Sequence, residues 1–185
     1  MKLTISDAGG LAQALKYLRE LRGRGERTLP LMQVIAQDLE NSTRLRFTDG
    51  RDPNGVPWVP LSLATRIARA RRASGGRVYT KDRRRTTAAF TRAFLAPTQP
   101  LRDTGRLANS ITSRATNDYA EVGTNVVYAK THQFGARQGQ YGRTKRGAPI
   151  PWGNVPARPF LGLSDADRLL IVERVESFIL GAMRP

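Results

Sequence analysis

The chain of 185 residues contains no cysteine and only one histidine. Without cysteine it cannot build a disulfide scaffold, a thiolate zinc site or a cysteine nucleophile. Negative charge is also scarce, because 15 Asp and Glu residues stand against 31 Lys and Arg, which gives a formal net charge of +16. A surface with this charge attracts polyanions, which include nucleic acid, acidic membranes and acidic protein surfaces.

Long hydrophobic runs are missing as well. No apolar stretch reaches the roughly 20 residues of a membrane-spanning helix, and the N-terminus lacks the basic and then apolar layout of a secretory signal. We therefore expect a protein that is made and used in a cytoplasm and has no membrane partner. With 39% hydrophobic and 25% charged residues, the composition is that of a globular protein. Residues 1–185 have room for a single domain with loose segments attached.

Helical signals dominate the two ends of the chain. Leucines at helical spacing predict a first helix from about Asp7 to Arg22, and a second helix begins after Thr28 with Pro30 in its first turn. Near the C-terminus, Ser164 and Asp167 have the spacing of a capping box, which predicts a closing amphipathic helix. The apolar stripe of this helix is expected at Leu169, Val172, Val175, Ile179 and Met183.

Strand signals appear only in the middle of the chain. Ile111–Ala115 and Tyr119–Gly123 flank the turn pair Asn117-Asp118, which predicts a β-hairpin. A small antiparallel β unit between an N-terminal helical hairpin and a C-terminal amphipathic helix defines the fold class as α+β. Residues 135–155 are rich in glycine and in basic residues, so we expect a flexible loop there.

Positive charge is concentrated in one part of the chain. Ser62 is placed to cap a short basic helix, and residues 73–100 then have the character of an inserted basic arm. Fully extended, this arm would reach ~90 Å at about 3.3 Å per residue. Ten cations and one carboxylate, Asp82, lie between Arg66 and Arg92, so this stretch carries +9 of the total charge. The candidate partner-binding residues are Arg66, Arg69, Arg71, Arg72, Arg77, Lys81, Arg83, Arg84, Arg85 and Arg92.

Two interpretations of these cations stay open on the residues alone. Arginine binds phosphate through its planar guanidinium group, and the interleaved aromatic residues Tyr79, Phe90 and Phe94 would suit a nucleic-acid groove. However, no helix-turn-helix, zinc or single-strand-binding module surrounds them, and the same cations would bind acidic protein surfaces equally well. A solvated arm without a partner is the third alternative.

His132 is the residue whose side chain titrates near neutral pH, so it could act as a general base, bind a metal or pack as a structural residue. A base needs an oriented acid or a nucleophile nearby, and a metal needs further ligands, but no carboxylate occurs between Glu121 and Asp165. Asp49 and Asp52 lie in a turn-rich loop, where aspartate commonly bonds to its own backbone. The sequence therefore favours a structural His132 and predicts no catalytic residue, no metal site and no bound cofactor.

Four short stretches in a fixed order carry the most specific signal in the chain. They are RFTDGRDPNGVPWVPLSLAT, LRDTGRLANSI, VGTNVVYAKTHQFGA and VPARPFLGLSDAD. Together they resemble the phage virion morphogenesis (tail completion) family of contractile-tailed phages and Mu-like prophages. The resemblance covers most of the chain and departs from the family in the arm at residues 73–100. Within these stretches we expect structural roles for Trp58, Tyr128, His132, Phe134 and Phe160.

These structural roles are of two kinds. Trp58 and Phe160 lie in stretches that are too apolar for plain loops, so we expect both to be buried. Tyr128, His132 and Phe134 are spaced by about one helical turn within a helix predicted over residues 126–134, so they could form one face of it.

The resemblance implies a non-enzymatic virion protein that completes the tail and supports head–tail joining. It would act as a homo-oligomeric ring, six-fold by analogy, at the tail–neck junction, as a tail terminator or a neck component. The implied partners are other copies of the chain, the tail tube or sheath, neck and connector proteins, and DNA that passes through the ring. Its place would be the tail–neck region of the virion, after assembly in the host cytoplasm. The alternative is a phage-derived nucleic-acid-binding protein that uses the Arg-rich arm.

Overall fold

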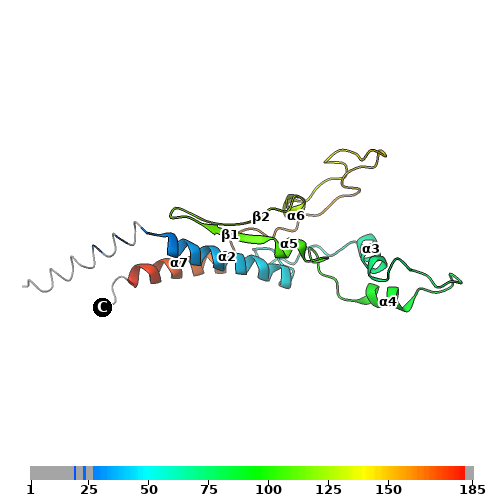
Figure 1. Ribbon diagram of the computed structural model, residues 1–185, viewed down its shortest axis with the longest axis horizontal. Helices are drawn as coiled ribbons and strands as arrows, with labels where there is room; N and C mark the ends of the chain where they lie inside the picture. Colours follow the sequence, from blue (N-terminus) through cyan, green and yellow to red (C-terminus); the bar gives the residue numbers. More distant parts are fainter. Residues whose placement is uncertain (1–18, 20–22, 24–26, 182–185) are drawn as a thin grey trace, which may run out of the picture. The chain divides into compact units, whose positions relative to one another are not determined.

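The computed structural model describes residues 19, 23 and 27–181 (Figure 1). The predicted first helix, Asp7 to Arg22, lies outside the described residues apart from Arg19, and so does Met183. Residue contacts divide the chain into two compact units, each assembled from separate segments. Unit 1 comprises Met1–Ser42, Thr112–Gly123 and Leu163–Pro185, and unit 2 comprises Thr43–Ile111 and Thr124–Gly162.

The described residues form helices and one two-stranded antiparallel sheet, so the fold is α+β as the sequence predicts (Figure 1). No helix in the described part of the chain is both long enough and apolar enough to cross a membrane. In chain order the elements are α2 (Leu29–Asp49), α3 (Leu63–Ala73), α4 (Ala88–Leu95), α5 (Arg106–Asn109), β1 (Ile111–Ala115), β2 (Ala120–Thr124), α6 (Ala129–Phe134) and α7 (Asp165–Leu180).

In unit 1, α7 lies along the first part of α2. Leu31 and Ile35 of α2 are buried at helical spacing. Arg174 of α7 forms an ion pair with Asp38 of α2, with 2.8 Å between Nε and Oδ2. The hydrogen bond and the charge of Asp38 raise the pKa of Arg174. The two helices are therefore joined by an apolar contact and a charged one.

The β-hairpin of unit 1 is fixed to α2 by polar contacts. The Ser113 hydroxyl of β1 donates to Glu40 Oε2 at 2.7 Å. At the hairpin turn, Asn117 Oδ1 accepts a hydrogen bond from Leu29 N at 3.0 Å, which satisfies one of the free amide groups at the start of α2. The predicted hairpin is confirmed, with β2 shifted by one residue from the predicted Tyr119–Gly123.

The predicted capping box of the closing helix is confirmed. The Ser164 hydroxyl accepts a hydrogen bond from Asp167 N at 3.1 Å, and Asp167 Oδ2 accepts one from Ser164 N at 2.8 Å. Both carboxylates of the first turn, Asp165 and Asp167, also complement the positive end of the helix dipole. The start of α7 is thus specified locally by the sequence.

The predicted apolar stripe of α7 is wrong at three of its four described positions, since Val175 alone is half-buried. Leu169, Val172 and Ile179 are 73%, 54% and 45% exposed, whereas Leu170 and Ile171 lie against α2 in unit 1. The helix carries apolar residues on two sides, so its periodicity alone fits either face. The ion pair between Arg174 and Asp38 sets which face of α7 meets α2, and it contributes nothing to an apolar pattern.

Unit 2 has an aromatic core in which three of the four motif stretches meet. Phe47 packs on Trp58 in a T-shaped contact with 5.6 Å between ring centroids, and on Phe160 at 5.2 Å. Trp58 Nε1 donates to Pro159 O at 2.8 Å, which satisfies the indole N–H inside the core. Trp58 is 5% exposed and Phe160 is fully buried, so their predicted burial is confirmed.

Two polar side chains hold the segment that contains Phe160. The Gln133 amide donates to Leu161 O at 2.9 Å and accepts from Phe160 N and Leu161 N, both at 3.0 Å. The buried Arg46 donates through Nη1 to Phe160 O at 2.9 Å and to Gly162 O at 2.8 Å. Within the described part of the chain this extended segment has no strand partner, and side chains satisfy its backbone instead. We call Arg46, Phe47, Trp58, Gln133 and Phe160 the motif core.

The segment predicted as a loop, 135–155, begins at a glycine that the packing requires. Gly135 has φ of 75°, and a Cβ atom there would lie 2.9 Å from both Ala157 N and Val155 O. The base of the loop is closed by a pair of hydrogen bonds between Ala136 and Val155, at 2.9 and 2.8 Å. The loop is therefore anchored directly beside the motif core.

Candidate partner-binding site

The basic helix and the inserted arm fold together into one helical hairpin. Ser62 caps α3 by accepting a hydrogen bond from Thr65 N at 3.2 Å, as predicted. Thr87 caps α4 in the same way, accepting from Phe90 N at 3.2 Å. The two helices pack against each other (Figure 1). We call residues 63–95 the basic hairpin, and it contains most of the inserted arm predicted at residues 73–100.

Two of the aromatic residues considered for nucleic-acid stacking hold this hairpin together. Phe90 is buried and stacks on Phe94 with 6.0 Å between centroids and 13° between ring planes. Arg66 of α3 places its Cζ 4.8 Å from the Phe94 ring centroid and donates to Phe94 O at 3.2 Å. Of the three aromatic residues only Tyr79 is exposed, so the hairpin presents no row of aromatic rings for stacking bases.

The loop between α3 and α4 is closed by its own backbone. Thr80 N donates to Arg85 O at 2.9 Å. The Asp82 carboxylate accepts hydrogen bonds from the Thr80 hydroxyl and from Arg84 N, and both lower the pKa of Asp82. Arg83, at the tip, has φ of 56°, a left-handed conformation that is uncommon for arginine. The one carboxylate of this stretch thus stabilises the turn that carries the arginine run.

The structure separates the ten predicted cations into two groups. Arg66 contacts Phe94 as described, and Arg69 and Arg72 both pair with Asp103, at 3.5 Å from Nε to Oδ1 and 2.6 Å from Nη1 to Oδ2. The other seven are exposed, and no carboxylate among the described residues forms an ion pair with them. These seven are Arg71, Arg77, Lys81, Arg83, Arg84, Arg85 and Arg92.

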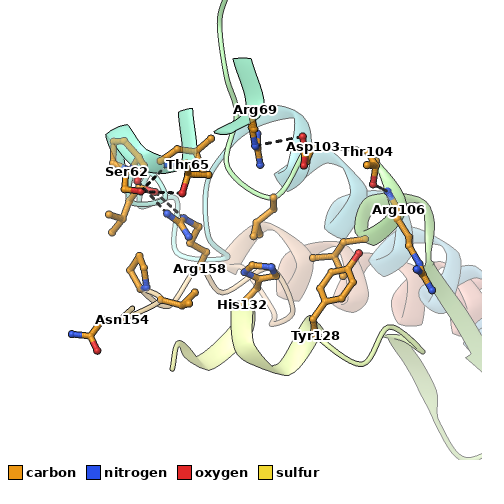
Figure 2. Close-up of a pocket in the computed structure, with 18 residues that line it drawn as sticks. Ser62, Thr65, Arg69, Asp103, Thr104, Arg106, Tyr128, His132, Asn154 and Arg158 are labelled. Atoms are coloured by element: carbon orange, nitrogen blue, oxygen red, sulfur yellow. Dashed lines mark hydrogen bonds and ion pairs between the residues drawn. The ribbon is translucent and has the colours of Figure 1, made fainter. Parts of the chain in front are cut away.

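A second polar feature of unit 2 is a cavity of about 630 Å³ beside α6 (Figure 2). It is enclosed by residues 59–65, 101–107 and 154–158 together with α6. Figure 2 shows Arg69 and Asp103 on one side of this space and His132 and Tyr128 on the other. The polar side chains that line it include Arg69, Asp103, Arg106, Tyr128, His132 and Arg158.

His132 packs beside this cavity with Tyr128 in a T-shaped contact, 5.8 Å between ring centroids. Burial, and then the charge of Arg158, lower the pKa of His132, which favours the neutral imidazole near pH 7. Its Nδ1 is buried and has no hydrogen-bond partner within the described residues. Phe134 does not share this face, since it is 74% exposed. Phe134 lies two residues after His132, so the helical repeat places its side chain on a different side of α6.

Arg158 is the buried cation of the cavity wall. Its Nε donates to Val59 O at 2.8 Å and its Nη2 donates to Pro60 O at 3.1 Å. Its backbone N donates to His132 O at 2.7 Å. Burial, and then the charge of Arg69, lower the pKa of Arg158. Arg158 therefore fixes α6 and the loop after Trp58 to one wall of the cavity.

Three residues important for this arrangement were not among the candidates taken from the sequence. They are Arg46, Gln133 and Arg158, and each donates to backbone carbonyls. All three lie inside the quoted motif stretches, so a polar residue embedded in a motif was the available signal. No group of three or more metal-ligating side chains occurs in the described part of the chain.

The basic hairpin and the cavity are two features of unit 2 that carry charged side chains. Comparison with known proteins supplies the family. The model of the phage virion morphogenesis family matches residues 9–99 and 91–179, and the two matches meet at the end of the basic hairpin. The chain belongs to this family.

Two curated relatives agree with this family. "Mu-like prophage FluMu G protein 2" of Haemophilus influenzae is 44% identical over 178 residues, which cover 96% of this chain and 95% of that protein. "Putative capsid assembly protein G" of Escherichia phage Mu is 38% identical over 80 residues, covering 43% of this chain and 46% of that protein. No solved structure matches the chain. These relatives support a structural role in building a phage virion.

Proposed function

We propose that this protein completes the phage tail and supports head–tail joining as a non-enzymatic ring at the tail–neck junction. The observation that carries the proposal is the family membership, since the two matched stretches together extend over residues 9–179. One relative is named for capsid assembly and the family for virion morphogenesis. A protein at the junction of head and tail would suit both descriptions.

The basic hairpin supports a docking role for this protein. Seven exposed cations without an internal carboxylate remain hydrated in the free protein and can pair with an acidic surface, which speeds encounter and selects against basic partners. Phe90 and Phe94 are engaged inside the hairpin. We therefore favour an acidic tail or neck protein over nucleic acid as the partner of the hairpin.

A ring also agrees with the surfaces of the two units. Unit 1 exposes Leu169, Val172 and Leu180 on α7, and unit 2 exposes the cations of the hairpin. Two different patches that meet head to tail generate a closed ring when the rotation between subunits closes. By family analogy we expect six subunits, in the virion after assembly in the host cytoplasm.

The proposal is tested by deleting the gene from its phage and imaging the particles by electron microscopy. We expect DNA-filled heads and separate tails that are not joined, and complementation with the intact gene should restore joined particles. Purified protein should form rings, at least on tails. Joined, infectious particles without the protein would contradict the proposal, as would one or two isolated copies per mature virion.

The alternative use of the basic hairpin is binding to DNA by its phosphates. If the seven exposed cations each neutralised a phosphate, the affinity for duplex DNA would fall with a log–log salt slope of about −6, regardless of sequence. Replacing Arg83, Arg84 and Arg85 with glutamate tests this alternative. Loss of DNA binding in this variant, together with its normal docking onto tails, would favour DNA as the partner.

A further inference from the structure

The cavity beside α6 has more positive than negative groups in its lining. Three arginine residues, Arg69, Arg106 and Arg158, contribute to its lining together with one acidic residue, Asp103. Asp103 is paired with both Arg69 and Arg72, so its charge is already compensated. Arg106 is exposed and forms no ion pair with a described carboxylate. The cavity therefore has an excess of positive charge.

The hydrogen-bonding groups of the cavity are also incompletely used. His132 Nδ1 is buried and has no partner among the described residues. Arg158 uses Nε and Nη2 for the carbonyls of Val59 and Pro60. Buried polar atoms without a partner are rare in folded proteins, and they commonly mark the place of a bound atom.

The walls between these polar groups are apolar. Val59, Leu101 and Leu107 contribute to the lining, and Leu107 is buried. A ligand that fits must therefore combine an apolar stem with an anionic head that guanidinium groups recognise. Carboxylate and phosphate both match a planar guanidinium. A phosphate within duplex DNA lies on the outside of a wide rod, which cannot enter a cavity of about 630 Å³.

We propose that this cavity is a socket for the carboxylate of a glutamate or aspartate side chain on a peptide segment of another protein. Arg158 would bind the carboxylate oxygens, with His132 beside it (Figure 2), while Val59 and Leu101 contact the stem. That the donor is a virion protein rests on the proposed function. The carboxylate chemistry does not, because it follows from the lining alone.

Occupancy of the socket changes the protonation of His132. In the free protein the groups that face the cavity with His132 are Arg69, Asp103, Arg106, Tyr128 and Arg158. Their excess positive charge disfavours the imidazolium, and a bound carboxylate reverses this effect, so binding raises the pKa of His132. Because the chain has one histidine, the imidazole C–H signals in its NMR spectrum report on this site alone.

The test titrates the full-length protein with acetyl-Leu-Glu-Leu-amide while the His132 signals are followed by NMR. We expect a saturable shift with a dissociation constant on the order of 1 mM, and a higher apparent pKa of His132 in the bound state. The same peptide with glutamine in place of glutamate should bind at least about tenfold more weakly, since it lacks the charge. No saturable shift, or equal binding of both peptides, would overturn the socket.

A matched pair of variants locates the binding. Arg106→Glu should weaken the binding of the glutamyl peptide by about tenfold or more, because it replaces a lining cation with an anion. Arg146→Glu makes the same change at an exposed position outside the lining and should leave binding unchanged. Equal effects of the two variants would contradict the proposal, and so would a saturable shift of the His132 signals by inorganic phosphate at lower concentrations than by the peptide. These measurements use isolated protein, so their outcome is independent of the deletion phenotype.

Discussion

The motif core and the basic hairpin, both in unit 2, use arginine and aromatic residues in opposite ways. In the motif core, Arg46 is 7% exposed and donates to two backbone carbonyls, and Trp58 and Phe160 are buried. In the basic hairpin, seven cations are exposed without an internal ion pair and Tyr79 is 60% exposed. The comparison indicates that the core stabilises the fold and that the hairpin is available to a partner.

The largest effect on stability is expected from truncating the motif core. Trp58→Ala removes an indole that contacts Phe47 and donates to Pro159 O, so it should lower the free energy of unfolding by about 3–5 kcal/mol. Urea unfolding followed by circular dichroism measures this change. Tyr79→Ala on the hairpin is the aromatic control and should change stability by less than ~0.5 kcal/mol. Similar losses from both variants would erase the contrast between the two regions.

A smaller loss is expected from the amide that holds the Phe160 segment. Gln133→Ala leaves Phe160 N, Leu161 N and Leu161 O without their partner, which should cost about 1–3 kcal/mol. Gln37→Ala is the control, because the hydrogen bond that its side chain makes within the described residues goes to the exposed Asn41 of α2, and it should cost less than ~0.5 kcal/mol. If the two glutamine variants unfold at the same urea concentration, the extended segment does not depend on Gln133.

His132 gives a pH-dependent effect of limited size. Its pKa is lowered in the folded protein, so below the ordinary value of 6.5 the unfolded chain binds the proton first. Stability from the neutral imidazole is therefore present above pH 6.5 and is lost as the pH falls below it. The loss cannot exceed about 1.4 kcal/mol per pH unit for one proton. His132→Gln should remove this slope between pH 7 and 5, and assembly should be retained; an unchanged slope would contradict a depressed pKa.

Local signals in the sequence were sufficient for much of the fold. The caps at Ser62 and Ser164 and the turn at Asn117-Asp118 each depend on neighbours a few residues away, so the sequence shows them directly. The rotation of α7 could not be predicted, because the ion pair that fixes it joins Asp38 to Arg174. Partners so far apart in the chain leave no local pattern.

The same reason explains which parts of the candidate site were missed. The cluster of cations was visible in the sequence, but its division into three engaged and seven exposed side chains depends on Asp103 and Phe94, which lie elsewhere in the chain. The sequence predicted an inserted arm at residues 73–100 without a helix in it, because the stacking of Phe90 on Phe94 arises only when α4 forms. The cavity beside α6 is built from four separate segments and had no signal of its own.

The smallest effect on stability is expected from changes at the tip of the basic hairpin. The same changes test most directly whether the hairpin binds a partner. Replacing Arg83, Arg84 and Arg85 with glutamate should change the free energy of unfolding by less than ~0.5 kcal/mol, since all three side chains are exposed. The control replaces Arg137, Lys145 and Arg146, which are also exposed, and makes the same change of charge in the loop at residues 135–155. Both variants should remain folded.

The most direct measurement is the docking of these two variants onto purified tails. Electron microscopy and co-sedimentation at physiological salt detect it, and both test whether the basic hairpin binds the tail. We predict that the hairpin variant remains folded but fails to dock, whereas the loop control docks normally. Normal docking of the hairpin variant would contradict the account. If that variant had also lost salt-sensitive binding to DNA, the basic hairpin would be a nucleic-acid-binding element.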